Sequence, residues 1–177
     1  MPVLSYDHYD MPIIESETEP GEYAIAFTDE IADYAVKQCI EESLWTFNAS
    51  FLAEMTDLPE EMFSGLQDKC EGANDAFLKV VKSTCGLDTF VDAAIAADGR
   101  GHFMSSYDGD EYTYSDMTAE FQAEIRQLLE EGELDWPEYD NYMAECDQEH
   151  PDESSDANWG SFENDHILGK VYIYRIN

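Results

Sequence analysis

The stretch Lys170-Val-Tyr-Ile-Tyr-Arg-Ile176 predicts a β-strand. Its side chains alternate along the chain, and they are rich in the β-branched and aromatic types that pack well on a pleated sheet. The segment Glu22-Tyr-Ala-Ile-Ala-Phe27 alternates in the same way and is a second candidate strand. The chain is therefore expected to contain a β-sheet, and the segments between these strands decide its fold class.

The segment between His102 and Tyr114 predicts a β-hairpin. Asp108-Gly109 is a dipeptide that favours type I′ turns, and strand-like runs at 102–107 and 110–114 flank it. We expect the 102–114 hairpin and the C-terminal strand to pair in one small antiparallel sheet, with residues 22–27 as a candidate addition.

Helical patterns fill most of the chain before the hairpin. Apolar residues recur at steps of three or four between Val36 and Met55, which places them on one face of a long helix. Thr28 is a candidate N-cap for this helix, and Leu58-Pro59 is expected to end it before a short helix through Phe63. Three further helical segments each precede a glycine: 77–84 before Gly86, 90–97 before Gly99, and a helix opened by Asp116 before Gly132.

These patterns predict an α+β fold in which about four helices pack on one face of the small antiparallel sheet. Residues 1–21 contain three prolines and no Lys or Arg, and they are expected to form an extended acidic arm. Residues 22–177 are then a single α+β domain with a loop-rich acidic segment at 133–165.

The composition excludes several classes of protein. The 177 residues include 41 Asp and Glu against 8 Lys and Arg, which gives a formal net charge of −33 and a pI of about 4.1. Direct binding to nucleic acid or to an anionic membrane is not expected, because both would repel this charge. With 44% hydrophobic and 13% aromatic residues, the chain is not a disordered polyelectrolyte. It has no apolar run of membrane-spanning length and no basic start of a signal peptide, so we expect a cytoplasmic protein.

No motif for catalysis or for cofactor binding is present. The chain contains no glycine-rich nucleotide-binding loop, zinc-protease motif, nucleophile elbow or EF-hand loop. The four histidines lie far apart and the four cysteines lack zinc-ligand spacing, so we expect no cofactor, no metal and reduced structural cysteines. An enzyme is therefore not expected, and His102 with Asp108 or Asp110 is the one constellation to check.

The acidic residues are distributed unevenly along the chain. No Lys or Arg lies between Arg126 and Lys170 or within residues 1–36, whereas fourteen acidic residues lie in the first of these intervals. A net charge of roughly 2 to 8 is sufficient for the solubility of a small domain, and a larger one destabilises the compact state. At about 1.7 Å of axis per charge, 33 charges correspond to about 56 Å of duplex DNA, longer than the diameter of about 40 Å expected for a compact chain of this length.

In size, charge and aromatic content the whole chain resembles the DNA-mimic inhibitors that phages and mobile elements direct against restriction enzymes, CRISPR effectors and other DNA-binding host proteins. The resemblance is one of composition and not of motifs, so it assigns no functional role to any residue of this chain. In addition, Gly99-Arg-Gly-His-Phe-Met-Ser-Ser-Tyr-Asp-Gly-Asp-Glu111 and Tyr172-Ile-Tyr-Arg-Ile-Asn177 resemble segments of small phage and plasmid proteins. The resemblance implies a non-enzymatic inhibitor, monomer or homodimer, that occupies the nucleic-acid-binding groove of a basic host defence protein in the host-cell cytoplasm.

Carboxylates on or beside helices are the candidates for the partner-binding surface, because a helix holds them in place and pre-organised charges lose less entropy on binding. They are Glu41, Glu42, Glu54, Glu120, Glu124, Glu130, Glu131, Glu133 and Asp135. Two alternatives stay open: an acidic binding module or chaperone for a basic protein, and a halophile-adapted protein of another activity. Whether duplex DNA competes with the chain for its partner distinguishes the binding module from a mimic. Whether the chain stays folded without salt distinguishes the halophile-adapted protein, which should unfold.

Overall fold

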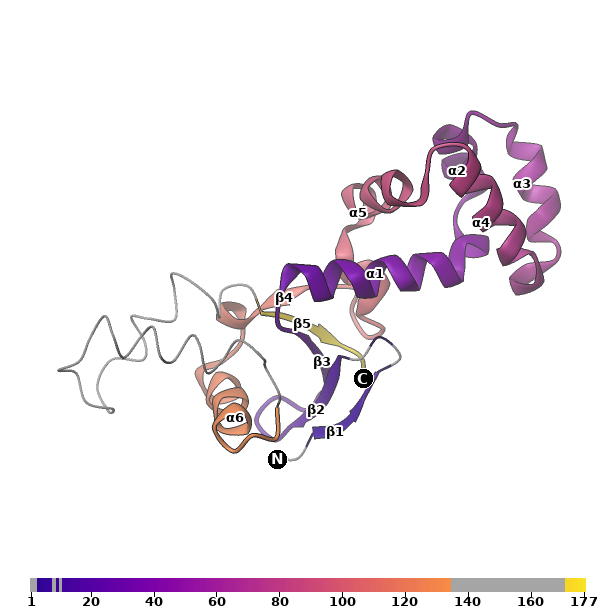
Figure 1. The fold of residues 1–177 in the computed structure, drawn as a ribbon. Helices are drawn as coiled ribbons and strands as arrows, with labels where there is room; N and C mark the ends of the chain where they lie inside the picture. Colours follow the sequence, from indigo (N-terminus) through magenta and orange to yellow (C-terminus); the bar gives the residue numbers. More distant parts are fainter. Residues whose placement is uncertain (1–2, 8, 10, 135–170) are drawn as a thin grey trace, which may run out of the picture. The chain divides into compact units, whose positions relative to one another are not determined.

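The computed structural model describes residues 3–7, 9, 11–134 and 171–177, and Figure 1 shows them as a ribbon. The chain divides into two compact units, one formed by Met1–Ala32 with Ser105–Asn177 and the other by Asp33–Met104. We call them the sheet unit and the helical unit, and each is described by itself. This division corrects the expected single domain at 22–177, because the helices of 33–104 pack against one another and bury a core of their own.

The described residues of the sheet unit form one five-stranded antiparallel sheet in the order β1-β2-β3-β5-β4. Its strands are β1 (Val3–Tyr6), β2 (Pro12–Ser16), β3 (Gly21–Ala26), β4 (Tyr112–Thr113) and β5 (Tyr172–Arg175). Within it, Ile173 of β5 lies opposite Ile25 of β3 on one side and opposite Tyr112 of β4 on the other. The predicted strands at 22–27 and at the C-terminus are therefore confirmed, and they are neighbours in the middle of the sheet.

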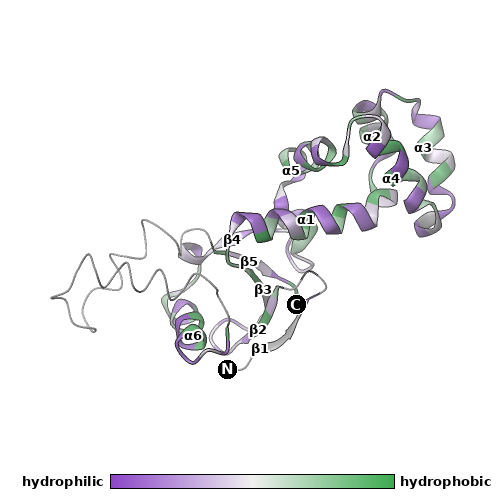
Figure 2. Ribbon diagram, viewed as in Figure 1, coloured by the Kyte–Doolittle hydropathy of each residue, from purple (hydrophilic) through white to green (hydrophobic). Residues whose placement is uncertain are grey.

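Helix α6 (Ala119–Glu130) packs on one face of this sheet. Its apolar stripe, which Figure 2 shows beside the hydrophilic residues of the same helix, consists of Phe121, Ile125, Leu128 and Leu129, all buried. The Phe121 ring meets the Tyr23 ring of β3 edge-on, with centroids 4.9 Å apart. Complete burial of such a side chain contributes about 1.5–3 kcal/mol relative to its exposure, so this stripe holds α6 in place. Glu120 and Glu130, outside this stripe, are left exposed.

The expectation of an extended acidic arm at residues 1–21 is wrong, because β1 and β2 are paired strands of the sheet. The prolines lie where a sheet tolerates them: Pro12 is the first residue of β2, and Pro20 lies in the turn before β3. Gly21 has a φ of +155°, and a side chain there would meet the carbonyl oxygen of Asn177. That oxygen accepts a hydrogen bond of 3.2 Å from the Glu22 N–H, so Asn177 continues the pairing of β5 with β3.

The predicted 102–114 hairpin is also wrong. Residues 102–104 are the end of a helix, and among the described residues Asp57 is the only non-glycine with positive φ, so Asp108-Gly109 does not form the type I′ turn. The hydroxyl of Ser105 instead shares its one proton between the carbonyl oxygen of Arg175, at 2.7 Å, and the Asp108 carboxylate, at 2.6 Å. These bonds hold the 105–110 loop against the end of β5, while β4 pairs with β5.

The helical unit consists of α-helices and 3-10 turns. Apart from α6, the described residues of both units form these helical elements: α1 (Asp29–Ser43), η1 (Leu44–Thr46), α2 (Ala49–Thr56), α3 (Glu60–Gln67), η2 (Cys70–Ala73), α4 (Asn74–Ser83), α5 (Leu87–Met104) and η3 (Tyr114–Asp116). Of these, η3 belongs to the sheet unit, and the division between the units falls within α1. The six α-helices and one antiparallel sheet of the described residues confirm the α+β class, although the expected number of about four helices was too low.

The long helix predicted from the 36–55 stripe is interrupted, because the helical hydrogen bonding of α1 stops at Ser43 and α2 starts only at Ala49. Asn74 accepts a hydrogen bond from the Trp45 N–H at 3.2 Å and donates one to the Glu41 carbonyl at 2.8 Å. The amide of Gln67 donates to the carbonyl oxygens of Trp45 and Phe47 at 3.2 and 2.6 Å. Side chains distant in sequence thus satisfy the backbone groups that the interruption leaves without helical partners.

The backbone conformation of three glycines confirms the helix ends predicted there. Gly86, Gly99 and Gly132 have φ values of +86°, +78° and +70°, a region that residues with a side chain rarely adopt. Gly99 ends the first of two helices that together make up α5, and the chain is helical again up to Met104. Helix α6 is opened by Thr118, not by Asp116, because the Thr118 hydroxyl accepts the hydrogen bond of the Phe121 N–H.

Candidate protein-binding surface

The two units differ strongly in charge. The helical unit contains 13 acidic and 5 basic residues and has a net charge of −8. The sheet unit contains 28 acidic and 3 basic residues and has a net charge of −25. The excess negative charge per residue is therefore about twice as large in the sheet unit.

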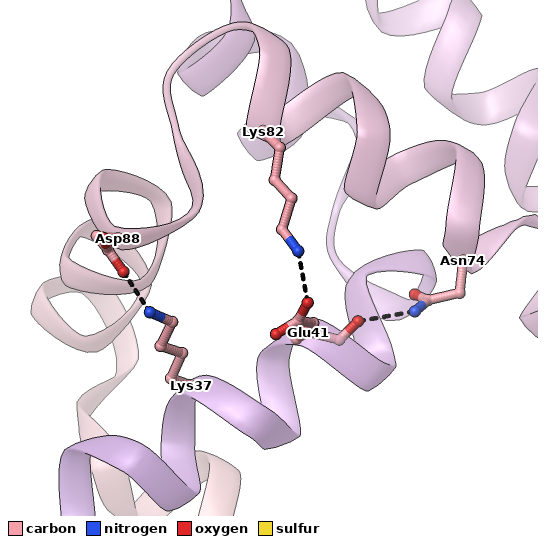
Figure 3. A network of polar contacts seen from close by, with 5 residues as sticks. All are labelled: Lys37, Glu41, Asn74, Lys82 and Asp88. Atoms are coloured by element: carbon pink, nitrogen blue, oxygen red, sulfur yellow. Dashed lines mark hydrogen bonds and ion pairs between the residues drawn. The ribbon is translucent and has the colours of Figure 1, made fainter.

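In the helical unit, cations are paired with several of the carboxylates. Figure 3 shows Lys37 donating to Asp88 and Lys82 donating to Glu41, each over 2.6 Å. The pKa of Lys37 is raised by its hydrogen bond to Asp88 and by the charge of that carboxylate. Arg100 likewise pairs with Asp33 at 3.0 Å. Exposed pairs of this kind contribute little to the stability of a fold, but they reduce the charge that the surface presents.

In the sheet unit, Glu124 shows a different arrangement. This residue of α6 accepts hydrogen bonds from the Ser16 hydroxyl at 2.7 Å and from the backbone N–H groups of Glu17 and Thr18 at 3.2 and 3.1 Å. All three donors are neutral, so they fix the two carboxylate oxygens without cancelling their charge. The bonds also connect α6 to the turn after β2.

Asp108 is held in the same way. Its carboxylate accepts hydrogen bonds from the hydroxyls of Ser105 and Tyr112, at 2.6 and 3.0 Å, and from the Asp110 N–H at 3.1 Å. Burial alone would raise the pKa of Asp108, but these hydrogen bonds and the nearby charge of Arg175 lower it below its ordinary value of 3.8. The carboxylate is therefore ionised at neutral pH.

Further carboxylates of the sheet unit accept hydrogen bonds from neutral groups. Asp116 accepts from the N–H and the hydroxyl of Thr113 at 2.8 and 2.7 Å, and these bonds lower its pKa below 3.8. Glu19 accepts from the Thr118 N–H at 3.2 Å. Asp29 and Glu111 accept from the hydroxyls of Tyr172 and Tyr174, both at 2.6 Å. The sheet unit thus holds several carboxylates in defined positions with neutral donors.

The predicted partner-binding residues are divided between the two units. Glu41, Glu42 and Glu54 lie in the helical unit, and Glu120, Glu124, Glu130, Glu131 and Glu133 lie on or after α6 in the sheet unit. Asp135 and most of the predicted acidic segment at 133–165 lie outside the described residues. Glu41 and Glu124 are half-buried and serve the fold through the bonds given above, whereas the others in the described part of the chain are exposed.

Sequence reasoning missed the carboxylates of the loops and turns. Asp108 and Tyr112 are four residues apart, and Thr113 and Asp116 are three apart, so hydroxyls close in sequence to acids were the available signal. The bond between Ser16 and Glu124 joins residues 108 positions apart, and no local pattern indicates it.

The hairpin that was expected to carry His102 with Asp108 or Asp110 is absent from the described residues. His102 is an exposed residue of α5 whose ring meets Phe103 edge-on at 5.0 Å, and Asp108 is engaged in the loop bonds described above. Within residues 3–7, 9, 11–134 and 171–177, no group of three His, Cys, Asp or Glu side chains could hold a metal ion. Cys39 and Cys85 are free thiols, each with a carbonyl oxygen of its own unit within hydrogen-bond reach.

Comparison with known proteins adds no identification. No family model, no curated protein and no solved structure matches this chain. In the part of the chain that the structure describes, every helix is too short or too polar to cross a membrane.

Proposed function

We propose that this chain is a non-enzymatic DNA mimic that binds the nucleic-acid groove of a basic host defence protein, such as a restriction enzyme or an RNA-guided nuclease, through its sheet unit. One observation carries the proposal: the unit with a net charge of −25 holds carboxylates such as Glu124 and Asp108 in place with neutral donors. Phosphates of DNA are likewise anions held in fixed positions.

The charge density indicates that the whole sheet unit is needed for mimicry. Glu120 and Glu130 are ten residues apart on α6, which corresponds to about 15 Å along the helix axis. Over that length duplex DNA carries roughly nine negative charges, whereas α6 carries three, at 120, 124 and 130. Helix α6 alone is therefore too sparse, and the loop and turn carboxylates must contribute to the field that a basic groove meets.

The mechanism is competition for the groove. A strongly acidic surface increases the rate of encounter with a Lys- and Arg-lined groove, and fixed carboxylates lose little entropy when they pair there. Binding releases the counterions of the groove just as DNA binding does, so the affinity should fall steeply with salt. No cofactor or bond-breaking step is required.

The test is displacement of a fluorescein-labelled 20-base-pair duplex from a type I restriction enzyme and from an RNA-guided DNA nuclease. We compare the wild-type chain with Glu120→Gln/Glu130→Gln/Glu133→Gln in the sheet unit and with Glu54→Gln/Glu60→Gln/Glu61→Gln in the helical unit. All six side chains are exposed, and each variant removes three charges. At about 0.2–1 kcal/mol for each exposed pair, the sheet-unit variant should weaken displacement roughly 3- to 160-fold, and the helical-unit variant should weaken it less.

Thermal unfolding by circular dichroism first confirms that both variants are folded. Equal losses in the two variants, or an affinity that does not change between 50 and 300 mM NaCl, would contradict mimicry by the sheet unit. Binding to a basic protein without displacement of its duplex would support the alternative of an acidic binding module.

A further inference from the structure

Tyr107 is an aromatic side chain that the sheet unit keeps at its surface. It is 59% exposed and lies in the loop that follows α5. The guanidinium carbon of Arg175 lies over its ring at 3.9 Å from the centroid, a cation–π contact. Arg175 also donates hydrogen bonds to the carbonyl oxygens of Pro20 and Asn177, at 2.8 and 3.4 Å, so the cation beneath the ring is itself anchored.

The loop around Tyr107 is fixed on both sides. The Tyr107 N–H donates to the carbonyl oxygen of Arg175 at 3.2 Å, and the Ser105 hydroxyl donates to the same oxygen at 2.7 Å. On the other side, the Asp108 carboxylate accepts from Ser105 and from the Asp110 N–H. Because the backbone and one ring contact are already set, little conformational freedom remains to be lost when a partner covers the ring.

We propose that Tyr107 is a contact for an arginine side chain of the partner, and this inference rests on the proposed function. The ring is 59% exposed while Arg175 contacts it, so surface remains for a second cation. Asp108 and the exposed Asp110, within three residues of the ring in sequence, place carboxylates in the same loop. A guanidinium can stack on the ring while it donates to a carboxylate, whereas a lysine ammonium is a compact and strongly hydrated charge that stacks less well.

The probes are fluorescein-labelled hexa-arginine and hexa-lysine peptides, which carry equal charge, with affinities measured by fluorescence anisotropy. Wild type should bind the arginine peptide more tightly than the lysine peptide. Tyr107→Ala should reduce this arginine-to-lysine ratio about two- to five-fold, as expected for an exposed cation–π contact, with little change for the lysine peptide. Tyr107→Phe keeps the ring and should keep the ratio.

Tyr34 provides the matched control. It is 57% exposed on α1, in the helical unit, and Tyr34→Ala should leave the ratio unchanged. An unchanged ratio in Tyr107→Ala, or an equal fall in Tyr34→Ala, would overturn the inference. The duplex-displacement assay with the same variants keeps the two proposals distinct. If wild type displaces the duplex and Tyr107→Ala does so equally well, only the Tyr107 contact is refuted. If wild type displaces no duplex, the mimic function itself is refuted.

Discussion

At the scale of single residues, the carboxylates of the sheet unit stabilise the fold through neutral donors, and Asp116 allows this to be measured. It forms a reciprocal capping box with Thr113 at the start of η3. We expect Asp116→Ala to lower stability at pH 7 by about 0.5–1.5 kcal/mol, the usual net contribution of a hydrogen bond, which corresponds to roughly 2–4 °C in the melting temperature for each kcal/mol. Asp110→Ala, which removes an exposed carboxylate of the neighbouring loop, should have a smaller effect.

The difference between wild type and Asp116→Ala should also depend on pH. The hydrogen bonds from Thr113 lower the pKa of Asp116 in the folded state below its ordinary value of 3.8. The stabilisation is therefore fully present above pH 4 or so, the unfolded-state value, and is lost as the pH falls through the lower folded-state value. The melting temperatures of wild type and Asp116→Ala should differ at pH 7 and converge at pH 2.5. A difference between the two proteins that is constant with pH would contradict an ionic role for this carboxylate.

At the scale of elements, the interruption between α1 and α2 depends on Asn74, which bonds the Trp45 N–H and the Glu41 carbonyl. We expect Asn74→Ala to reduce the free energy of unfolding by about 1–3 kcal/mol, because it leaves two half-buried backbone groups without these partners. Asn48→Ala is the matched control, since the exposed Asn48 side chain makes no capping hydrogen bond at the start of α2. Urea unfolding of the full chain measures both, and equal effects would show that Asn74 does not determine the interruption.

At the scale of the whole molecule, the uneven charge of the two units predicts uneven responses to salt. Self-repulsion destabilises a compact state, and it acts more strongly at −25 than at −8. Since the screening length falls from about 30 Å at 0.01 M to about 3 Å at 1 M, added NaCl should stabilise the sheet unit more. Hydrogen exchange followed by mass spectrometry should show a larger gain of protection in β3 than in α4.

The same experiment addresses the halophile alternative. A mimic that functions in ordinary cytoplasm should keep both units folded at 10 mM NaCl, with protected amides in β3 and in α4. Complete loss of protection at 10 mM NaCl in both units would favour a halophile-adapted protein. Equal gains in the two units would contradict the link between local charge and stability.

Local patterns in the sequence determined the elements whose side chains repeat with one period. The alternation at 22–27 and 170–176 predicted β3 and β5, and the stripe from Phe121 to Leu129 predicted α6, because the same residues that set the period also bury the core. The glycines at 86, 99 and 132 were equally informative, since their positive φ values are a property of the residue itself. The α+β class followed from these signals together with the expected 102–114 hairpin, and the class is right although that hairpin does not form.

Tertiary structure alone decided where the chain stops following its local pattern. The 36–55 stripe is continuous in sequence, yet Asn74 and Gln67 bond the backbone at residues 45 and 47 and make the interruption favourable. Asp108-Gly109 favours a tight turn in isolation, but the bonds of Ser105 to Arg175 and Asp108 hold that loop on β5 instead. The charge of each carboxylate can be read from the sequence, whereas its donor cannot, because the hydroxyls and N–H groups that reach Glu124 come from residues more than 100 positions away.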